Sequence, residues 1–234
     1  METKSPPEIV PALGFAWLTP LYDAVMAVTM REKLFRSALI GQAAIGPRHE
    51  VLDLACGTGT LAVMICAQDR AAKVTGLDAD PQVLEIARRK AREAGVAVKF
   101  DEGFSNRLPY PDGSFDRVVS SLLFHHLSSP NKVATAVEVF RVLRPGGEVH
   151  VADWGRPANA VMGSLFLMVR LLDGFPNTRE NVQGKLADIF RAAGFVDVKQ
   201  TGAMSTLFGT LAFYRALRPD DPGGRSTREA GRSR

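Results

Sequence analysis

Residues 51–62 read VLDLACGTGTLA, a buried-type apolar run followed by a turn that contains two glycines. Gly57, Gly59 and Ala62 match the G-x-G-x-x-(G/A) spacing, in which one glycine makes the turn, one admits a ligand to the backbone and the small third residue allows close packing of a helix. Asp78 ends the next apolar run, where a carboxylate can accept hydrogen bonds from both hydroxyls of a ribose. The pattern predicts a strand, a turn and a helix that bind a nucleoside-containing cofactor.

The same alternation of short apolar runs and helical stretches continues along the chain, which is typical of βα units around a parallel sheet. We predict helices at residues 60–67, 81–94, 130–143, 159–172 and 185–193. Strands are predicted at 51–55, 73–77, 96–100, 115–120, 148–152, 195–200 and 206–216, with a break at residues 145–147 before the fifth. The expected fold is α/β, a Rossmann-like, seven-stranded, mostly parallel sheet with helices on both faces.

Composition and charge divide the 234 residues into three parts. Residues 1–48 are aromatic-rich and are expected to form an N-terminal helical cap, followed by a cofactor-binding domain at 49–217. Residues 218–234 are expected to form a disordered basic tail, because they have almost no apolar side chains to bury. The net charge is +4, but residues 215–234 hold six Arg against three acidic residues, which leaves 23 basic and 22 acidic residues elsewhere. We therefore expect no nucleic-acid partner.

Several classes of protein are disfavoured by the same composition. The two cysteines, Cys56 and Cys66, form no C-x-x-C pair, so we expect neither a disulfide framework nor a metal site. The apolar run at 160–169 is uncharged for ten residues, against the roughly 20 that a membrane-spanning helix needs. The N-terminus lacks a basic segment followed by an apolar one, so no secretory signal is expected and the predicted location is cytoplasmic.

Asp53 distinguishes between the possible cofactors because it lies four residues before Gly57. A carboxylate there would repel the pyrophosphate of a nicotinamide or flavin cofactor, whereas the methionine end of S-adenosylmethionine carries an ammonium group and a sulfonium. The charge favours S-adenosylmethionine. An NAD(P)-dependent oxidoreductase and a non-catalytic cofactor-binding module remain the alternatives, as does a purely structural role for Asp53 as a cap of the loop.

Four ordered elements of the sequence resemble the class I S-adenosylmethionine-dependent methyltransferases, in particular the ubiquinone/menaquinone branch. They lie at residues 51–59, 76–78, 108–121 and 143–147, and Leu21-Tyr22-Asp23 resembles the Tyr-Asp element that precedes the core in that branch. The resemblance implies that the turn holds the methionine portion, that Asp78 holds the ribose, that Ser121 touches the cofactor and that Tyr22 closes over it. The implied cofactor-binding set is Tyr22, Asp53, Ala55, Gly57, Thr58, Gly59, Asp78, Ala79, Phe104, Ser105 and Ser121.

Two positions depart from the family pattern. Ala55 stands where the commonest form has a glycine, although alanine is usual in the quinone branch. Phe104 occupies the place of an aspartate that often accepts the adenine amino group. A ring cannot accept that bond, so we expect Phe104 to cover the adenine while Ser105 supplies the polar contact, with core packing of Phe104 as the alternative.

Methyl transfer from a sulfonium requires alignment with the acceptor, and a base only where the acceptor loses a proton. His126 and His125 follow the fourth strand and are the candidates for this base; the alternative is that they only hydrogen-bond the loop. Because adjacent side chains point different ways, at most one should face the acceptor.

The acceptor is predicted to be a small hydrophobic molecule such as a prenylated quinol, a lipid or an aromatic metabolite. Two apolar segments, the cap and residues 154–175, should line its pocket; their apolar side chains are Phe15, Trp17, Met162, Leu165, Phe166, Met168 and Val169. The alternatives are that the second segment packs on the sheet or contacts a bilayer surface.

Overall fold

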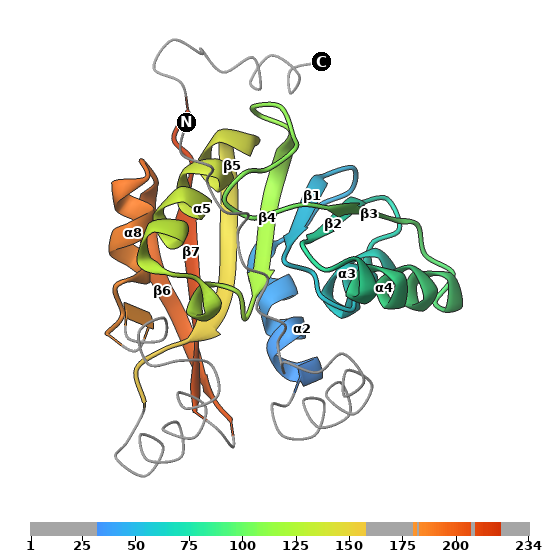
Figure 1. Ribbon diagram of the computed structural model, residues 1–234, viewed down its shortest axis with the longest axis horizontal. Helices are drawn as coiled ribbons and strands as arrows, with labels where there is room; N and C mark the ends of the chain where they lie inside the picture. Colours follow the sequence, from blue (N-terminus) through green and yellow to red (C-terminus); the bar gives the residue numbers. More distant parts are fainter. Residues whose placement is uncertain (1–31, 158–179, 182, 207–208, 221–234) are drawn as a thin grey trace, which may run out of the picture.

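A seven-stranded sheet in the order β3-β2-β1-β4-β5-β7-β6 forms the centre of the protein (Figure 1). The computed structural model describes residues 32–157, 180–181, 183–206 and 209–220. The strands are β1 (Glu50–Leu54), β2 (Lys73–Asp78), β3 (Val98–Glu102), β4 (Phe115–Ser121), β5 (Leu143–Trp154), β6 (Val196–Ser205) and β7 (Thr210–Leu217). Strands β1 to β5 pair in parallel, whereas β7 is antiparallel to both β5 and β6. The predicted mostly parallel sheet is confirmed.

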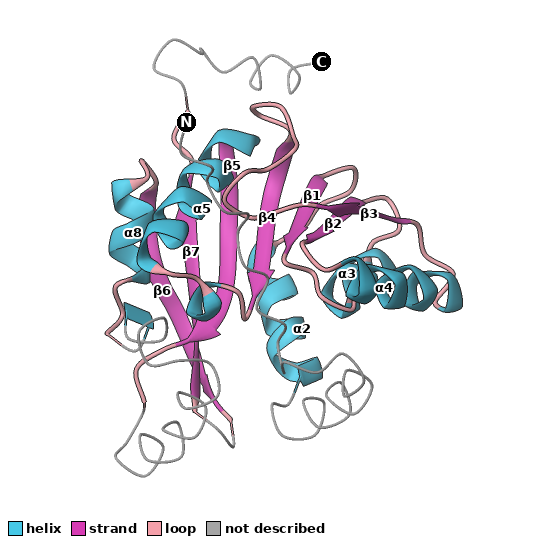
Figure 2. Cartoon of the chain, viewed as in Figure 1, coloured by secondary structure: helices cyan, strands magenta, loops and turns pink. Residues whose placement is uncertain are grey.

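Helices cover both faces of this sheet (Figure 2). In the described part of the chain they are α2 (Glu32–Ala43), α3 (Thr60–Gln68), α4 (Pro81–Glu93), α5 (Ser129–Val142) and α8 (Leu186–Ala192). Helices α2, α3 and α4 share one apolar core with the sheet, which contains Phe35 and Leu61. Helices α5 and α8 share the other core, which contains Val139 and Phe190. The sheet is therefore buried on both faces, as expected for parallel strands.

In helix α4, the local sequence determines where the helix begins and which of its faces is buried. The Asp80 carboxylate accepts a hydrogen bond from the N–H of Gln82 at 2.8 Å, and Pro81 occupies the first helical position, where its missing N–H costs nothing. Leu84, Ala87 and Ala91 follow helical spacing and are buried against the sheet. Both the start and the buried face of this helix are as the sequence predicted.

The fifth strand differs most from its prediction. We expected residues 148–152, but β5 begins at Leu143 and runs through Pro145, Gly146 and Gly147. Leu143 pairs with Phe115, and a shift of register before the next pair accommodates the irregular residues. The third strand starts at Val98 instead of residue 96. The last pair is also shifted, because β6 extends to Ser205 and β7 begins only at Thr210.

Helix α2 is the described portion of the predicted N-terminal cap, and it is fixed to the sheet. Gln42 near its end donates a hydrogen bond to the carbonyl of Tyr214 in β7 at 2.9 Å. Tyr22 and the apolar side chains predicted to line the acceptor pocket lie outside the described residues. Within the described part of the chain, no helix is long and apolar enough to cross a membrane.

Candidate functional site

The carboxyl ends of the parallel strands bring the predicted cofactor residues to one edge of the sheet. Strand β1 lies between β2 and β4, so the turn at Gly57–Gly59 is flanked by Asp78 at the end of β2 and Ser121 at the end of β4. Phe104 follows β3, which is the next strand out. This edge is where open α/β sheets bind their ligands.

The turn after β1 has a left-handed backbone at three positions, with φ of +56° at Ala55, +52° at Gly57 and +75° at Gly59. A Cβ at Gly59 would lie 2.7 Å from the Cβ of Ala87 in α4, so this position admits only glycine. A Cβ at Gly57 would have no atom within 4 Å, which leaves room above the turn. Gly57 therefore leaves space for a ligand, whereas Gly59 serves close packing against α4, a task that the spacing had assigned to the small residue Ala62.

Asp78 holds the turn in place. One carboxylate oxygen accepts a hydrogen bond from the N–H of Gly57 at 2.8 Å, and the other accepts from the N–H of Asp80 at 3.1 Å. Burial raises the pKa of Asp78, and these two backbone hydrogen bonds oppose the shift. Each carboxylate oxygen has a further lone pair, so the residue can still accept hydrogen bonds from ribose hydroxyls.

Asp53 in β1 is the unusual group at this edge. It is 1% exposed, and neither carboxylate oxygen has a side-chain partner among the described residues. Burial raises the pKa of Asp53 to about 7, while the positive charge of Arg36 acts in the opposite direction. The backbone N–H of Ala62, in the first turn of α3, also acts on this carboxylate and lowers its pKa, which is the contact that the alternative role as a structural cap predicts. A buried carboxylate without a side-chain partner is costly, and a cationic ligand would relieve that cost.

The residues predicted to surround the adenine differ in their exposure and in their hydrogen-bond partners. Phe104 is 36% exposed, so its alternative role as a core residue is wrong. The hydroxyl of Ser105 pairs with that of Thr135 in α5 at 2.9 Å, which leaves the backbone of Ser105 as its simplest polar contact with a ligand. Ser121 and Ala79 are half-buried at the ends of their strands.

His125 is held by a buried carboxylate. It lies in a short 3-10 turn, Phe124–His126, after β4, is 3% exposed, and its Nδ1 is 2.8 Å from an oxygen of Asp153. Asp153 also accepts hydrogen bonds from the N–H groups of Phe124 and Trp154 and from the amide of Asn181. Burial would raise the pKa of Asp153, but the charge and hydrogen bond of His125 and the backbone N–H groups lower it overall. The carboxylate is therefore ionised.

His126 lies directly beside His125, with ring centroids 3.9 Å apart. The two rings therefore do not diverge, contrary to the premise that adjacent side chains point different ways. Burial, followed by the charge of His125, lowers the pKa of His126 to about 3. His126 is thus neutral at physiological pH.

Comparisons with known proteins identify the family of the chain. A model of the methyltransferase domain matches residues 51–147. The demethylmenaquinone methyltransferase of Deinococcus radiodurans is 33% identical over a match that covers 65% of this chain and 63% of that protein. The ubiquinone/menaquinone biosynthesis C-methyltransferase UbiE of Bdellovibrio bacteriovorus is 31% identical, with 91% of this chain and 97% of that protein covered. The chain belongs to the UbiE-type class I methyltransferases.

As a UbiE-type methyltransferase, the protein uses S-adenosylmethionine as its cofactor. Its fold is shared more widely. The [4+2]-cyclase SpnF superposes with a TM-score of 0.69 at 19% identity, covering 87% of this chain and 94% of that one. This likeness concerns the fold alone, because one fold can carry several chemistries. The nicotinamide-dependent alternative is not favoured.

Sequence reasoning missed three residues of the site in this UbiE-type chain: Asp153, Asn181 and Arg36. Asp153 directly follows the predicted fifth strand, and a carboxylate at a strand end was a signal of the kind that identified Asp78. Asn181 and Arg36 carry no such signal, because their positions depend on packing between segments distant in sequence.

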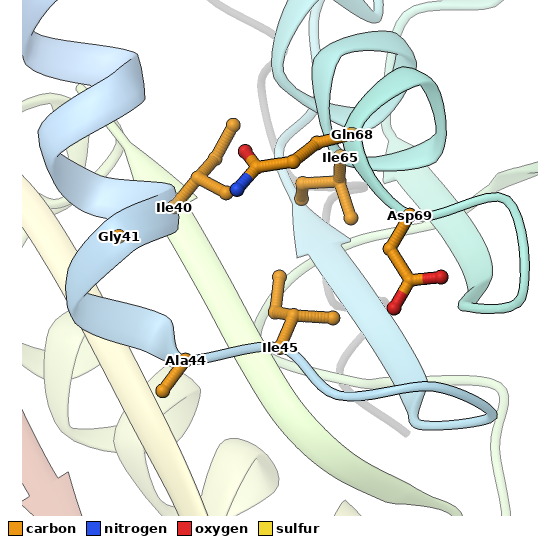
Figure 3. Close-up of a pocket in the computed structure, with 7 residues that line it drawn as sticks. All are labelled: Ile40, Gly41, Ala44, Ile45, Ile65, Gln68 and Asp69. Carbon is orange, nitrogen blue, oxygen red and sulfur yellow. The ribbon is translucent and has the colours of Figure 1, made fainter.

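A pocket of about 260 Å³ lies elsewhere, between the ends of α2 and α3 (Figure 3). Its lining combines apolar side chains with a polar end formed by Gln68 and Asp69; the residues are Ile40, Gly41, Ala44, Ile45, Ile65, Gln68 and Asp69. These residues precede β1 and β2 in the chain, so the pocket is at the opposite edge of the sheet from the glycine turn. It is not the cofactor site.

Proposed function

We propose that this methyltransferase acts on a ring carbon of a prenylated quinol, with the His125–Asp153 pair as the group that handles the acceptor proton. The names of the curated relatives support a quinone-related acceptor. The observation that carries the proposal is the ionised, fully buried Asp153 bound to His125 at the same sheet edge as the glycine turn.

The cofactor residues have separate tasks in this proposal. Asp53 faces the methionine ammonium group, the turn at Gly57–Gly59 holds the methionine portion, and Asp78 accepts the ribose hydroxyls. When bound, S-adenosylmethionine supplies an electrophilic methyl group and leaves as a neutral thioether. The task of the chain is therefore to align the acceptor with that methyl group and to exclude water.

His125 would act on the hydroxyl group of the acceptor. A quinol ring carbon becomes nucleophilic when its hydroxyl loses a proton, and an imidazole is suited to take that proton near neutral pH. Once the methyl group has joined the ring carbon, that carbon would lose its own hydrogen as a proton and the ring oxygen would regain one, which restores the quinol. Because Asp153 occupies Nδ1, proton exchange with the acceptor would use Nε2. The Asp153 carboxylate fixes the tautomer and stabilises the imidazolium that forms.

Substitution of His125 tests this assignment. We expect His125→Gln to lower kcat by about 10²–10⁴-fold, because general-base catalysis contributes that much. His49→Gln is the matched control, since His49 precedes β1 at the opposite edge of the sheet. Affinity for S-adenosylhomocysteine should be unchanged in both variants. A His125→Gln enzyme with near-native kcat would refute the role of His125.

The acceptor itself is tested by methyl transfer from a labelled donor to reduced demethylmenaquinone with a short prenyl chain. We expect label in the ring methyl group of the product with the reduced acceptor and none with the oxidised quinone, which has no hydroxyl proton to lose. Label in neither reaction, despite tight binding of S-adenosylhomocysteine, would exclude a quinol acceptor.

A further inference from the structure

Arg36 is a second incompletely paired charge near the cofactor turn. It lies in the first half of α2, and its Nη2 forms an ion pair with Glu32 at 2.8 Å. Its Nε and Nη1 atoms are buried, and neither has a hydrogen-bond acceptor among the described residues. A guanidinium cannot lose its charge at physiological pH, so these buried N–H groups need an anionic or carbonyl partner.

Arg36 and Asp53 face the same side of the sheet. Side chains alternate along β1: Leu52 and Leu54 belong to the core beneath α5, whereas Val51 belongs to the core that includes α2. Asp53 lies two residues after Val51, so its side chain is on the same face of the sheet and points toward the α2 side. The charge of Arg36 acts on Asp53, yet no hydrogen bond joins the two side chains.

Arg36 and Asp53 are opposite in charge, are not hydrogen-bonded to each other and each have buried polar atoms without a side-chain partner, so together they suit a ligand that carries a positive and a negative group. An α-amino acid end presents an ammonium group and a carboxylate on one carbon atom. We propose that Arg36 binds the α-carboxylate of the methionine end of the cofactor while Asp53 binds its α-ammonium group. This inference rests on the proposed cofactor site and is independent of the acceptor and of His125.

The local charges also balance in this arrangement. Glu32, Arg36 and Asp53 sum to −1 when all are ionised, and S-adenosylmethionine, with its sulfonium, ammonium and carboxylate groups, sums to +1. Placing the ligand between these side chains would therefore satisfy the unpaired atoms and neutralise the buried site. A nucleotide phosphate at the same place would satisfy Arg36 but would leave Asp53 beside another anion.

Binding of three ligands tests the pairing without any need for turnover. The probes are S-adenosylhomocysteine, its analogue without the α-carboxylate and its analogue without the α-amino group. In the wild-type protein we expect each deletion to weaken binding by about tenfold to hundredfold, the usual effect of losing a hydrogen bond between charged groups.

Each variant should lose its discrimination against a different one of the two analogues. Arg36→Gln should lose discrimination against the analogue without the carboxylate and keep its discrimination against the analogue without the amino group. Asp53→Asn should do the reverse. Lys33→Gln is the matched control, because it removes an exposed cation from the same helix and should bind all three ligands as the wild type does.

Three results would overturn the inference. They are loss of binding of all three ligands by Arg36→Gln, unchanged discrimination in that variant, and a wild-type protein that binds the analogue without the carboxylate within about threefold of the parent ligand. The last measurement needs no variant, so it decides even if Arg36→Gln does not fold. A wild-type protein that fails to bind S-adenosylhomocysteine at all would overturn the proposed cofactor site as well.

Discussion

At the scale of single residues, Asp53 is costly to the fold in the absence of a ligand. Its pKa is raised from 3.8 to about 7 by burial, so the folded state binds a proton more tightly than the unfolded chain does. The contribution of this group to stability is therefore fully present below about pH 4 and is lost as the pH rises through about 7. A residue retained at such a cost is expected to serve binding.

Asp53→Asn should therefore stabilise the protein without ligand at about pH 8, by roughly 1–3 kcal/mol in the free energy of unfolding, because the charge penalty exceeds the cost of a buried amide. The gain should disappear near pH 4, where the wild-type carboxyl group is protonated. Urea denaturation at both pH values measures the difference. Asp188→Asn, at an exposed surface ion pair, should show neither effect. A variant that is destabilised at pH 8 would contradict the account.

Individual site residues were predictable only where a short motif fixed them. Gly57, Gly59 and Asp78 follow from spacing and strand ends, because the turn requires those backbone and side-chain properties. Arg36 and Asn181 were not predictable, since their roles arise from tertiary contacts. The pairing of His125 with Asp153 likewise depends on β4 and β5 being neighbours, which the order of the sequence does not state.

At the scale of elements, the two glycines in the turn between β1 and α3 have different tasks, one in packing and the other in ligand binding. Gly59 touches α4, whereas Gly57 faces open space, although both have positive φ. The two glycines of one motif should therefore fail in different ways when each is replaced by alanine.

Gly59→Ala should lower the free energy of unfolding by about 2–4 kcal/mol, because the new methyl group would clash with Ala87 and the side chain of Phe100. Gly57→Ala should cost only about 1 kcal/mol of backbone strain but should weaken binding of S-adenosylhomocysteine by about tenfold or more. Thermal unfolding and calorimetric titration of the pair measure both quantities. Equal destabilisation by the two substitutions would show that the turn does not divide these tasks.

Elements with strong local signals matched the sequence best. Helix α4 has a capping residue, a first-turn proline and regular apolar spacing, so tertiary contacts had little to change. The start of β5 was missed because Pro145, Gly146 and Gly147 are locally typical of a turn. Pairing of Leu143 with Phe115 overrides that preference, and only the neighbouring strand reveals it.

At the scale of the whole molecule, the folded body extends past the end of β7. Arg218, which the sequence assigned to the tail, donates hydrogen bonds to the carbonyl groups of Phe140, Arg141 and Leu143 at the end of α5. Its backbone also pairs with Gly146 and Gly147. A cation at a helix C-terminus satisfies carbonyl groups that have no partner within the helix.

Two truncations separate the body from the predicted tail. Removal of residues 221–234 should leave the melting temperature unchanged, whereas removal of residues 218–234 should lower stability by about 1–3 kcal/mol through the loss of the Arg218 contacts. Arg218→Ala in the full-length chain should reproduce most of the second effect. Equal stability of the two truncated proteins would show that Arg218 contributes nothing to the body.

The central claim is that the buried Asp53 carboxylate receives the ammonium group of the cofactor, and proton release on binding tests it most directly. Titration of S-adenosylhomocysteine near pH 6.5, in buffers of different ionisation enthalpy, measures the protons exchanged. Because Asp53 is largely protonated at that pH and would ionise beside an ammonium group, we predict release of about 0.5–0.8 proton by the wild type and none by Asp53→Asn. Binding without proton release, or equal release by both proteins, would contradict the claim.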